Sequence, residues 1–552
     1  MRSVRRPLLL LPVFGIAIAT LSGNSQTGDQ APGPYRIAGT VVSMADGHPL
    51  QRASVAIIDT ADRKPVQSMT SDEYGHFAFT GVPAGMFTLQ GTTSGYLTTS
   101  YDEHEGFNTG ITTGAGVDTE SLVLKLQPQG AMAGTILDEA AEPVQSATVH
   151  LFRQSKNSGD DSRTSPVGTE NTDDLGRFEF PHLGPGTYLL AVSARPWYAV
   201  YPDPVQQERP SPSGFADFHD PSLEVAYPTT YYPGTADPAE ASPILVRGGD
   251  SVDLHLQLQP VPSVSVTLPH VVPKEGQPDA IPQLRTSIFG QPQSPAGQQL
   301  RQNPTQVVFY GLAPGDYRLV DGRTPFDLSE TGTKLHLSDR STNATLLAVS
   351  GLAHVHVLLQ SAHGAKLAPR ITVSLVHRHG DTSVRGATDD KNEVTLDAEP
   401  GDYFFEVSAA QRYFVPQIAA GDQVLPANNI HLDASANASV TLTIVPGIHT
   451  LKGFVRKDGK PAPGTFLLLV PTAEVHEIRT FFLQQSDLDG SFSITGLGPG
   501  DCSLFAIEGG WDINWHQDAV LSRYVPAAIP VQIPDTTDRI QTLPEPIAVQ
   551  PK

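Results

Sequence analysis

The fold of this chain is decided by a stretch that reads Thr172-Asp173-Asp174-Leu175-Gly176-Arg177-Phe178-Glu179-Phe180 and continues to Gly184-Pro185-Gly186-Thr187-Tyr188. An aspartate at the start of a turn accepts backbone N–H bonds, and Gly176 supplies the positive φ that such a turn needs. Phe178 and Phe180 then alternate with polar residues, which is the period of a half-buried strand. The Pro185-Gly186 pair turns the chain again, and Tyr188 follows. The stretch therefore predicts two successive strands with inward-facing aromatic side chains.

The same pattern recurs at 71–79 and at 486–494. In every copy ten positions separate the turn glycine from the second glycine; the pairs are Gly75 and Gly85, Gly176 and Gly186, and Gly490 and Gly500. Three matches at one spacing indicate an internal repeat. Two degenerate copies lie between, at 308–317 and at 388–396. In the second of these Asn392 replaces the turn glycine, and asparagine also tolerates the left-handed conformation.

Opening strands are expected before the strong copies, at 37–42, 132–137 and 451–456, and long helical periodicity is absent. Many short strands in units of about 90–130 residues predict an all-β chain of tandem β-sandwich modules. We expect these modules, arranged as a rod or a compact string, at 35–127, 128–260, 261–360, 361–446 and 447–552. The second carries an insertion rich in aromatic residues and proline, and the third and fourth are degenerate.

The N-terminus has the features of an export signal. Arg2, Arg5 and Arg6 precede an apolar run at 8–21, and small residues follow. The run is short for a membrane span, so we expect a signal peptide at 1–25, with a retained anchor as the alternative. The mature chain, with no transmembrane span, would then be periplasmic, on the cell surface or extracellular.

Charge and cysteine content limit the possible partners and chemistry. The formal net charge is −22, which repels the phosphates of nucleic acids, so we expect no nucleic-acid partner. Cys502 is the single cysteine, so no intrachain disulfide can form. It stands where the other copies have an aromatic, which favours a buried core thiol.

Short catalytic and metal-binding motifs are missing from the sequence. It has no His-x-x-Glu, His-Glu-x-x-His, Gly-x-Ser-x-Gly or phosphate-binding loop, so we expect no catalytic residue and no cofactor. The pairs His354/His356 and His377/His379 have ligand-like spacing, but no carboxylate or cysteine lies close to them in sequence, which favours solvent-facing histidines and no metal site. Likewise, the segment 487–490 resembles part of a calcium-binding loop. The distal glutamate that such a loop needs is missing, which favours an ordinary hairpin turn.

Units one, two and five resemble the carboxypeptidase regulatory-like domain, a transthyretin-like, Ig-like sandwich found in exported bacterial proteins. The resemblance lies in the strands around Gly39, Gly134 and Gly453 and in the turns quoted above. It implies a non-catalytic module related to carbohydrate-binding-like folds, and it carries over no catalytic residue. Carbohydrate is the leading ligand class by this analogy alone.

Aromatic residues outside the repeat are the candidate ligand-binding residues. Those in or beside the insertion are Trp197, Tyr227, Tyr231 and Tyr232, and those near the C-terminus are Trp511 and Trp515. Exposed rings stack on sugars or dock a partner; the alternative is that they cap a sandwich or fill a domain junction. The sequence thus predicts an exported binding or scaffold protein whose partner is a polysaccharide or a cell-envelope protein. An adhesion spacer and a hydrolase with an unrecognised site are the alternatives.

Overall fold

The computed structural model describes most of the chain after residue 32. The described residues are 33–552 apart from 115, 156–162, 202–219, 270–280, 303–304, 321–332, 339–340, 344–351, 363, 365, 378–382, 410–412, 422, 426–428, 472–480, 516 and 535–538. The expected signal peptide at 1–25 lies outside the described residues. Within them, no helix has both the length and the apolar character needed to cross a membrane.

Each repeat folds into two β-sheets that enclose an apolar core, and we call these sheet pairs the first to fifth modules. One sheet of the first module consists of β4 (His76–Val82), β1 (Tyr35–Ser43) and β8 (Leu122–Leu126). The other consists of β3 (Pro65–Thr70), β2 (Ser54–Asp59) and β5 (Gly85–Thr92), with β6 (Thr99–Ser100) and β7 (Ile111–Thr113) beside β5. Alternate side chains of both sheets fill the space between them, among them Ile37, Val55, Phe77 and Phe87.

The second module repeats this plan and adds the insertion. Its sheets are β12 (Arg177–Leu183), β9 (Gly130–Leu137) and β17 (Ser251–Gln257), and β11 (Arg163–Asn171), β10 (Thr148–Ser155) and β13 (Gly186–Ser193) with β15 (Thr230–Tyr231) and β16 (Ile244–Val246). The described part of the insertion contains η2 (Pro221–Leu223), η3 (Pro238–Glu240) and the strand β14 (Val225–Ala226), which pairs with β18 (Val261–Pro262).

The degenerate units also form sandwiches. The third module has β22 (Gln299–Gln302), β23 (Gln306–Leu312), β19 (Val264–Pro269) and β26 (Ser341–Asn343), facing β21 (Gln291–Gln293), β20 (Gln283–Ile288), β24 (Gly315–Val320) and β25 (Thr333–Leu337). The fourth has β30 (Glu393–Ala398), β27 (Ala353–Ser361), β35 (Asn437–Pro446), β32 (Tyr413–Ala420) and β33 (Gln423–Leu425), facing β29 (Ser383–Ala387), β28 (Thr372–His377), β31 (Gly401–Ser408) and β34 (Asn429–Leu432).

The fifth module adds short helices to the common plan. Its sheets are β37 (Lys460–Pro461), β36 (His449–Lys457), β40 (Ser491–Leu497), β43 (Ile540–Thr542) and β44 (Ile547–Ala548), and β39 (Phe482–Gln485), β38 (Phe466–Pro471), β41 (Gly500–Ile507) and β42 (Ile529–Ile533). Between β41 and β42 lie η6 (Gly510–Asp512), α1 (Asp518–Leu521) and η7 (Val525–Ala527). Strand content is 59% and helix content 4%, which confirms the predicted all-β sandwich class.

A phenylalanine and a glycine pair across the sheet in each strong copy. Phe178 lies opposite Gly134, and Phe492 lies opposite Gly453. A Cβ atom on Gly134 would come within 2.8 Å of the Phe178 ring, and one on Gly453 within 2.7 Å of the Phe492 ring. In the second and fifth modules the glycine therefore leaves room for the ring, whereas a Cβ atom on Gly39 of the first module would meet the Leu122 carbonyl oxygen at 2.0 Å.

The predicted turn chemistry is also present. Gly176 has φ +71°, and Asn392, which replaces the glycine in the fourth module, has φ +64°. Asp173 Oδ1 accepts the N–H groups of Leu175 and Arg177 at 2.9 and 2.8 Å. The prediction that Asn392 adopts the left-handed conformation is confirmed.

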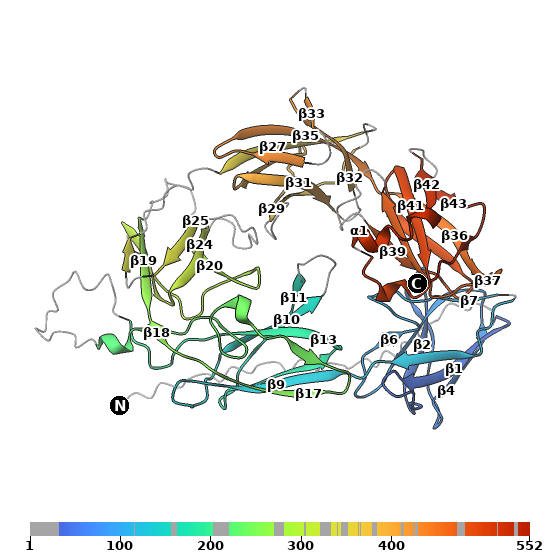
Figure 1. Cartoon of the computed structure of the whole chain (residues 1–552), viewed down its shortest axis with the longest axis horizontal. Coiled ribbons are helices and arrows are strands. Elements are labelled where there is room, and N and C mark those ends of the chain that lie inside the picture. The colour runs from blue at the N-terminus through green and yellow to red at the C-terminus, as the bar shows by residue number, and fades with distance from the viewer. Residues whose placement is uncertain are drawn as a thin grey trace, which may run out of the picture.

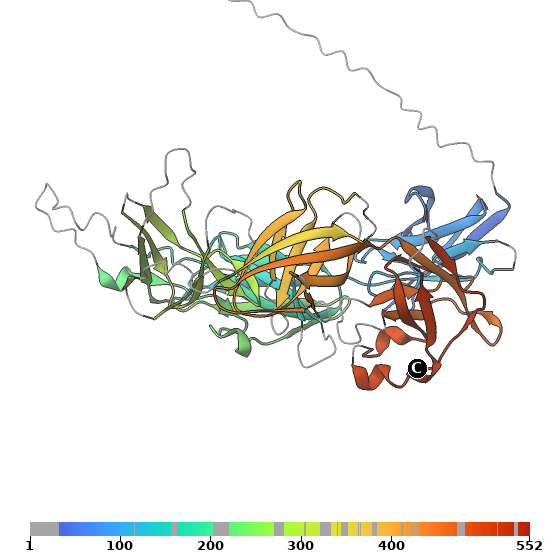
Figure 2. The same cartoon turned by 90° about the horizontal axis from the view of Figure 1, so that it is seen from above.

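The five modules do not form a rod. They close into a ring in which the first and fifth modules are neighbours (Figure 1). The sheets that contain β2, β10, β20, β31 and β39 lie toward the middle of the ring, and those that contain β1, β9, β19, β27 and β36 lie outside (Figure 1). Seen from above, the modules occupy one broad layer (Figure 2).

Substituting Phe178→Ala tests the repeat as a core element. Phe178 is 5% exposed, and removing a buried phenylalanine ring lowers the free energy of unfolding by about 3–5 kcal/mol. Leu175→Ala, in the same turn but 46% exposed, is the matched control and should change it by less than about 0.5 kcal/mol. Hydrogen exchange followed by mass spectrometry should show faster exchange in the second module for Phe178→Ala. Equal exchange in the two variants would contradict this role of the repeat.

Candidate functional site

Two tyrosines of the second module meet at one carboxylate. Tyr227 Oη donates to Glu139 Oε2 at 2.8 Å, and Tyr198 Oη donates to Glu139 Oε1. Tyr198 follows β13 and Tyr227 follows β14, so the contact ties both sides of the insertion to the turn after β9. Burial and the Glu139 carboxylate raise the pKa of Tyr198 to about 12 and also raise the pKa of Tyr227. Both phenols therefore remain hydrogen-bond donors at neutral pH.

Trp197 is the exposed member of the predicted aromatic set. Its side chain is 78% exposed, whereas Tyr227 is buried. The rings of Trp197 and Tyr198 meet edge to face, with centroids 5.8 Å apart and an interplanar angle of 88°. Because Glu139 holds Tyr198, the indole of Trp197 projects from a fixed support and leaves its surface open to a ligand.

Tyr231 lies in a junction between modules. It is 3% exposed, and its ring packs edge to face on Phe289 of the third module, with centroids 4.9 Å apart. Phe152 and Ile288 complete this apolar cluster. Tyr232 is partly buried against the core of the second module. Tyr231 thus fills a domain junction, which was the alternative to ligand binding, and its ring is not available for stacking on a sugar.

The two C-terminal tryptophans also pack against other side chains, Trp515 buried and Trp511 partly buried. Trp515 is 6% exposed and lies against Phe466 and Phe481. Trp511 contacts the first module: its ring stacks on His104 at an interplanar angle of 3° and on Phe107 at 28°, with centroids 5.8 and 5.3 Å apart. Trp511 therefore joins the two ends of the chain.

Polar groups beside Trp511 complete this ring-closing contact, which we define as Asp102, Thr109, Gly110, Gln485 and Asp487 together with the Trp511 stack. Gln485 is 1% exposed and donates to Asp102 O at 2.6 Å and to Thr109 Oγ1 at 2.7 Å. The Gly110 N–H donates to Asp487 Oδ1 at 3.0 Å. Buried amide and hydroxyl groups are costly to leave unpaired, so these bonds favour one fixed docking geometry.

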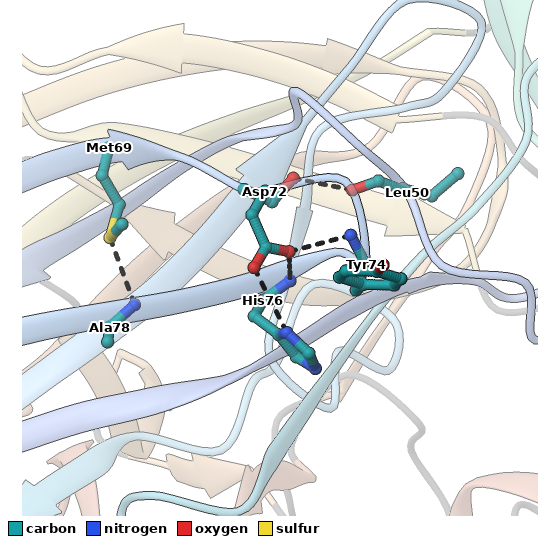
Figure 3. Close-up of polar contacts among 7 residues, drawn as sticks. Leu50, Met69, Asp72, Tyr74, His76 and Ala78 are labelled. Carbon is teal, nitrogen blue, oxygen red and sulfur yellow. Dashed lines mark hydrogen bonds and ion pairs between the residues drawn. The ribbon is translucent and has the colours of Figure 1, made fainter.

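The turn aspartate has a different role in the fifth module. In the first module Asp72 Oδ1 accepts the N–H groups of Tyr74 and His76 at 2.9 and 2.7 Å (Figure 3). Asp487 occupies the same place in the repeat, but its Oδ1 accepts from Gly110 of the first module. Asp489 accepts the Ser491 N–H instead, at 2.9 Å. The second aspartate of Asp487-Leu488-Asp489-Gly490 therefore supports the turn and leaves Asp487 for the ring-closing contact.

The sequence signal for this contact was the extra aspartate, which we interpreted only as a calcium-like fragment or a hairpin turn. Glu139, Asp102 and Gln485 carried no motif, because their partners lie 59 to 383 positions away in the chain. Their roles appear only when the modules are placed together.

The remaining predicted groups are structural or solvent-facing. Cys502 is buried in the fifth core, and burial raises its pKa to about 11, as expected for an unreactive thiol. His354 and His356 face solvent, and strand β30 brings Asp397 and Glu393 to within 2.6 and 3.7 Å of them. Among the described residues no group of three or more His, Cys, Asp or Glu side chains is arranged to hold a metal ion. His379 lies outside the described residues.

Stability should depend on pH through Asp487. Burial raises the pKa of Asp487 to about 7, against the opposing effect of the Gly110 N–H bond and with the help of nearby Asp489. The unfolded carboxyl loses its proton near pH 4, whereas the folded one keeps it to about pH 7. The folded state then binds more protons, so the free energy of unfolding should fall between about pH 4 and pH 7, by an amount on the order of a few kcal/mol.

Asp487→Asn keeps an acceptor for the Gly110 N–H and removes the titration. Across this pH range the temperature of thermal unfolding should fall less steeply for the variant than for the parent. At pH 8 the variant should be the more stable protein. The same pH slope in parent and variant would show that Asp487 does not titrate in this way.

Comparison with known proteins identifies one module by family. The model of the carboxypeptidase regulatory-like domain matches residues 36–127. No curated protein matches the chain. Among solved structures, the Bacillus anthracis TIE protein is similar at 11% identity, with a TM-score of 0.15, over 71% of this chain and 68% of that chain. The shaft pilin SpaA from Lactobacillus rhamnosus GG is similar at 10% identity, with a TM-score of 0.19, over 41% and 97%.

GBS52, the minor pilin of Streptococcus agalactiae, is similar at 11% identity, with a TM-score of 0.19, over 44% of this chain and all (100%) of that chain. The family match covers β1 to β8 and includes Gly39, the Asp72 turn and Phe77, the residues on which the resemblance was based. Residues 36–127 of this chain form a carboxypeptidase regulatory-like domain.

Proposed function

We propose that this protein is an exported, non-catalytic scaffold whose five sandwiches are held in a ring and present binding surfaces to a partner in the cell envelope. The observation that carries this proposal is the ring-closing contact. Gln485 and Asp487 bond to groups about 380 positions earlier in the chain, at a site buried from solvent.

Ring closure supports a scaffold because it fixes the modules relative to one another. A string of sandwiches joined at single connections samples many orientations, and closing its ends removes that freedom. Preorganised surfaces bind a large partner at lower entropic cost than mobile ones. The N-terminal charge and apolar pattern supports export, and the family of the first module supports a non-catalytic role.

A co-sedimentation assay tests this function. The chain without residues 1–25, incubated with cell-envelope fractions, should bind saturably and should release no soluble fragments of envelope polymers. Gln485→Ala removes the donor to Asp102 and Thr109 and should weaken binding, whereas Gln484→Ala, at the next position of β39, should not. Release of soluble products would contradict the non-catalytic role, and no saturable binding would contradict the scaffold.

A second candidate function is carbohydrate binding, and the exposure of Trp197 favours it. An indole held by the Tyr198–Glu139 pair offers a rigid, flat surface for a sugar ring. This surface is distinct from the ring-closing contact, so the two functions can be tested separately.

Trp197→Ala should weaken binding to insoluble polysaccharide. Truncating an aromatic anchor in an interface typically removes about 2 kcal/mol or more of binding free energy, so affinity should fall roughly 30-fold. Tyr74→Ala, which removes a 62% exposed ring from the first module, is the control. If both variants bind as the parent does, Trp197 is not a carbohydrate contact.

A further inference from the structure

Three cationic side chains form a row across one sheet of the third module. Arg285 on β20 lies opposite Arg318 on β24, and Arg318 lies opposite Lys334 on β25. Since each pair is in register, all three point to the same face of the sheet. Leu284, Leu319 and the other core residues occupy the opposite face. The row therefore lies on the face that points toward the middle of the ring (Figure 1).

Like charges in register on neighbouring strands destabilise a sheet. One carboxylate relieves part of this repulsion: Glu399 of the fourth module lies 3.2 Å from Arg318 Nη1 and 3.3 Å from Lys334 Nζ. Two of the three cations, Arg318 and Lys334, thus contact one carboxylate across the module junction.

Arg285 is held by neutral groups. Its Nη1 donates to Ser294 Oγ at 2.8 Å, and its Nη2 donates to Gln283 Oε1 at 2.6 Å. These two bonds fix the guanidinium without neutralising it, and a guanidinium binds a carboxylate strongly through paired N–H groups. Arg285 is therefore placed to bind an anion beside the carboxylate that Arg318 and Lys334 already hold.

The row borders a cavity of about 510 Å³ that is also lined by Ser287, Pro292 and Leu335, and by Asp316, whose carboxylate pairs with His336 at 2.7 Å. A volume of this size is typical of small-molecule sites. The lining combines charged groups, a hydroxyl and short apolar surfaces, which suits a ligand that is itself part polar and part apolar. A sugar bearing one carboxylate has this combination of groups.

We propose that this cavity binds a compact ligand with a single carboxylate, of the class of the acidic monosaccharides, with Arg285 as the residue that binds the carboxylate. Long polyanions are disfavoured because the net negative charge of the chain repels them. One carboxylate loses little to that long-range repulsion and gains the local attraction of the row. This cavity depends on neither ring closure nor Trp197. An experiment can therefore contradict the proposed ligand without contradicting the scaffold function.

Binding of sodium glucuronate to the chain without residues 1–25, measured by calorimetry, tests the proposal. The parent should bind glucuronate saturably and more weakly as salt is added. Arg285→Gln should lower the affinity by about tenfold or more, because it removes the charge-assisted bonds. Arg301→Gln makes the same change on β22, in the other sheet of this module, and should leave the affinity unchanged.

Glu399→Gln should raise the affinity, because it removes the negative charge that lies 3.2 Å from Arg318 Nη1 and 3.3 Å from Lys334 Nζ. Opposite effects of Arg285→Gln and Glu399→Gln would support the site, and a merely structural role of the row would not produce them. The proposal is overturned if the parent does not bind glucuronate saturably, or if Arg285→Gln binds as the parent does. It is also overturned if neutral glucose or inorganic phosphate binds as tightly as glucuronate.

Discussion

The arrangement of the five modules depends on a buried polar contact between the two ends of the chain. Gln485 and Asp487 meet Asp102, Thr109 and Gly110 there, beside the stack of Trp511 on His104 and Phe107. Each of these polar groups would lose water without compensation if its partner were absent. The contact therefore favours a single geometry of the first and fifth modules relative to each other.

Specialisation of one repeat made this contact possible. The template needs an aspartate to hold its turn, as Asp72 and Asp173 do. In the fifth module a second aspartate, Asp489, accepts the backbone N–H bond within the turn, and Asp487 bonds to the first module. The change requires no alteration of strands or core, because Phe492 and Gly453 still pair as they do in the other strong copies. Asp489 stands where the other strong copies have Tyr74 and Leu175, so one difference within a turn of the same length leaves Asp487 available for a contact between modules.

Sequence alone predicts what is local in this protein. The strands, the inward-facing phenylalanines, the buried Cys502 and the left-handed Asn392 follow from periods of two and from turn chemistry, and the structure agrees with them. Contacts between modules were not predictable, because no pattern relates Gln485 to Asp102 or Tyr231 to Phe289. For the same reason the exposure of the aromatics could not be assigned: Trp197 and Tyr231 are the same kind of residue in one insertion, but only Trp197 is exposed.

Ring closure is the central claim, and the distance between the two terminal modules tests it most directly. The exposed residues Lys125 and Lys460 are replaced by cysteines that carry spin labels, and the labels report that distance in solution. The native cysteine, Cys502, is buried. Our account predicts a narrow distribution for this pair, which becomes broad and longer when Gln485→Ala and Trp511→Ala are combined in the labelled chain. A broad distribution that these substitutions leave unchanged would contradict it, since the modules would then be a flexible string.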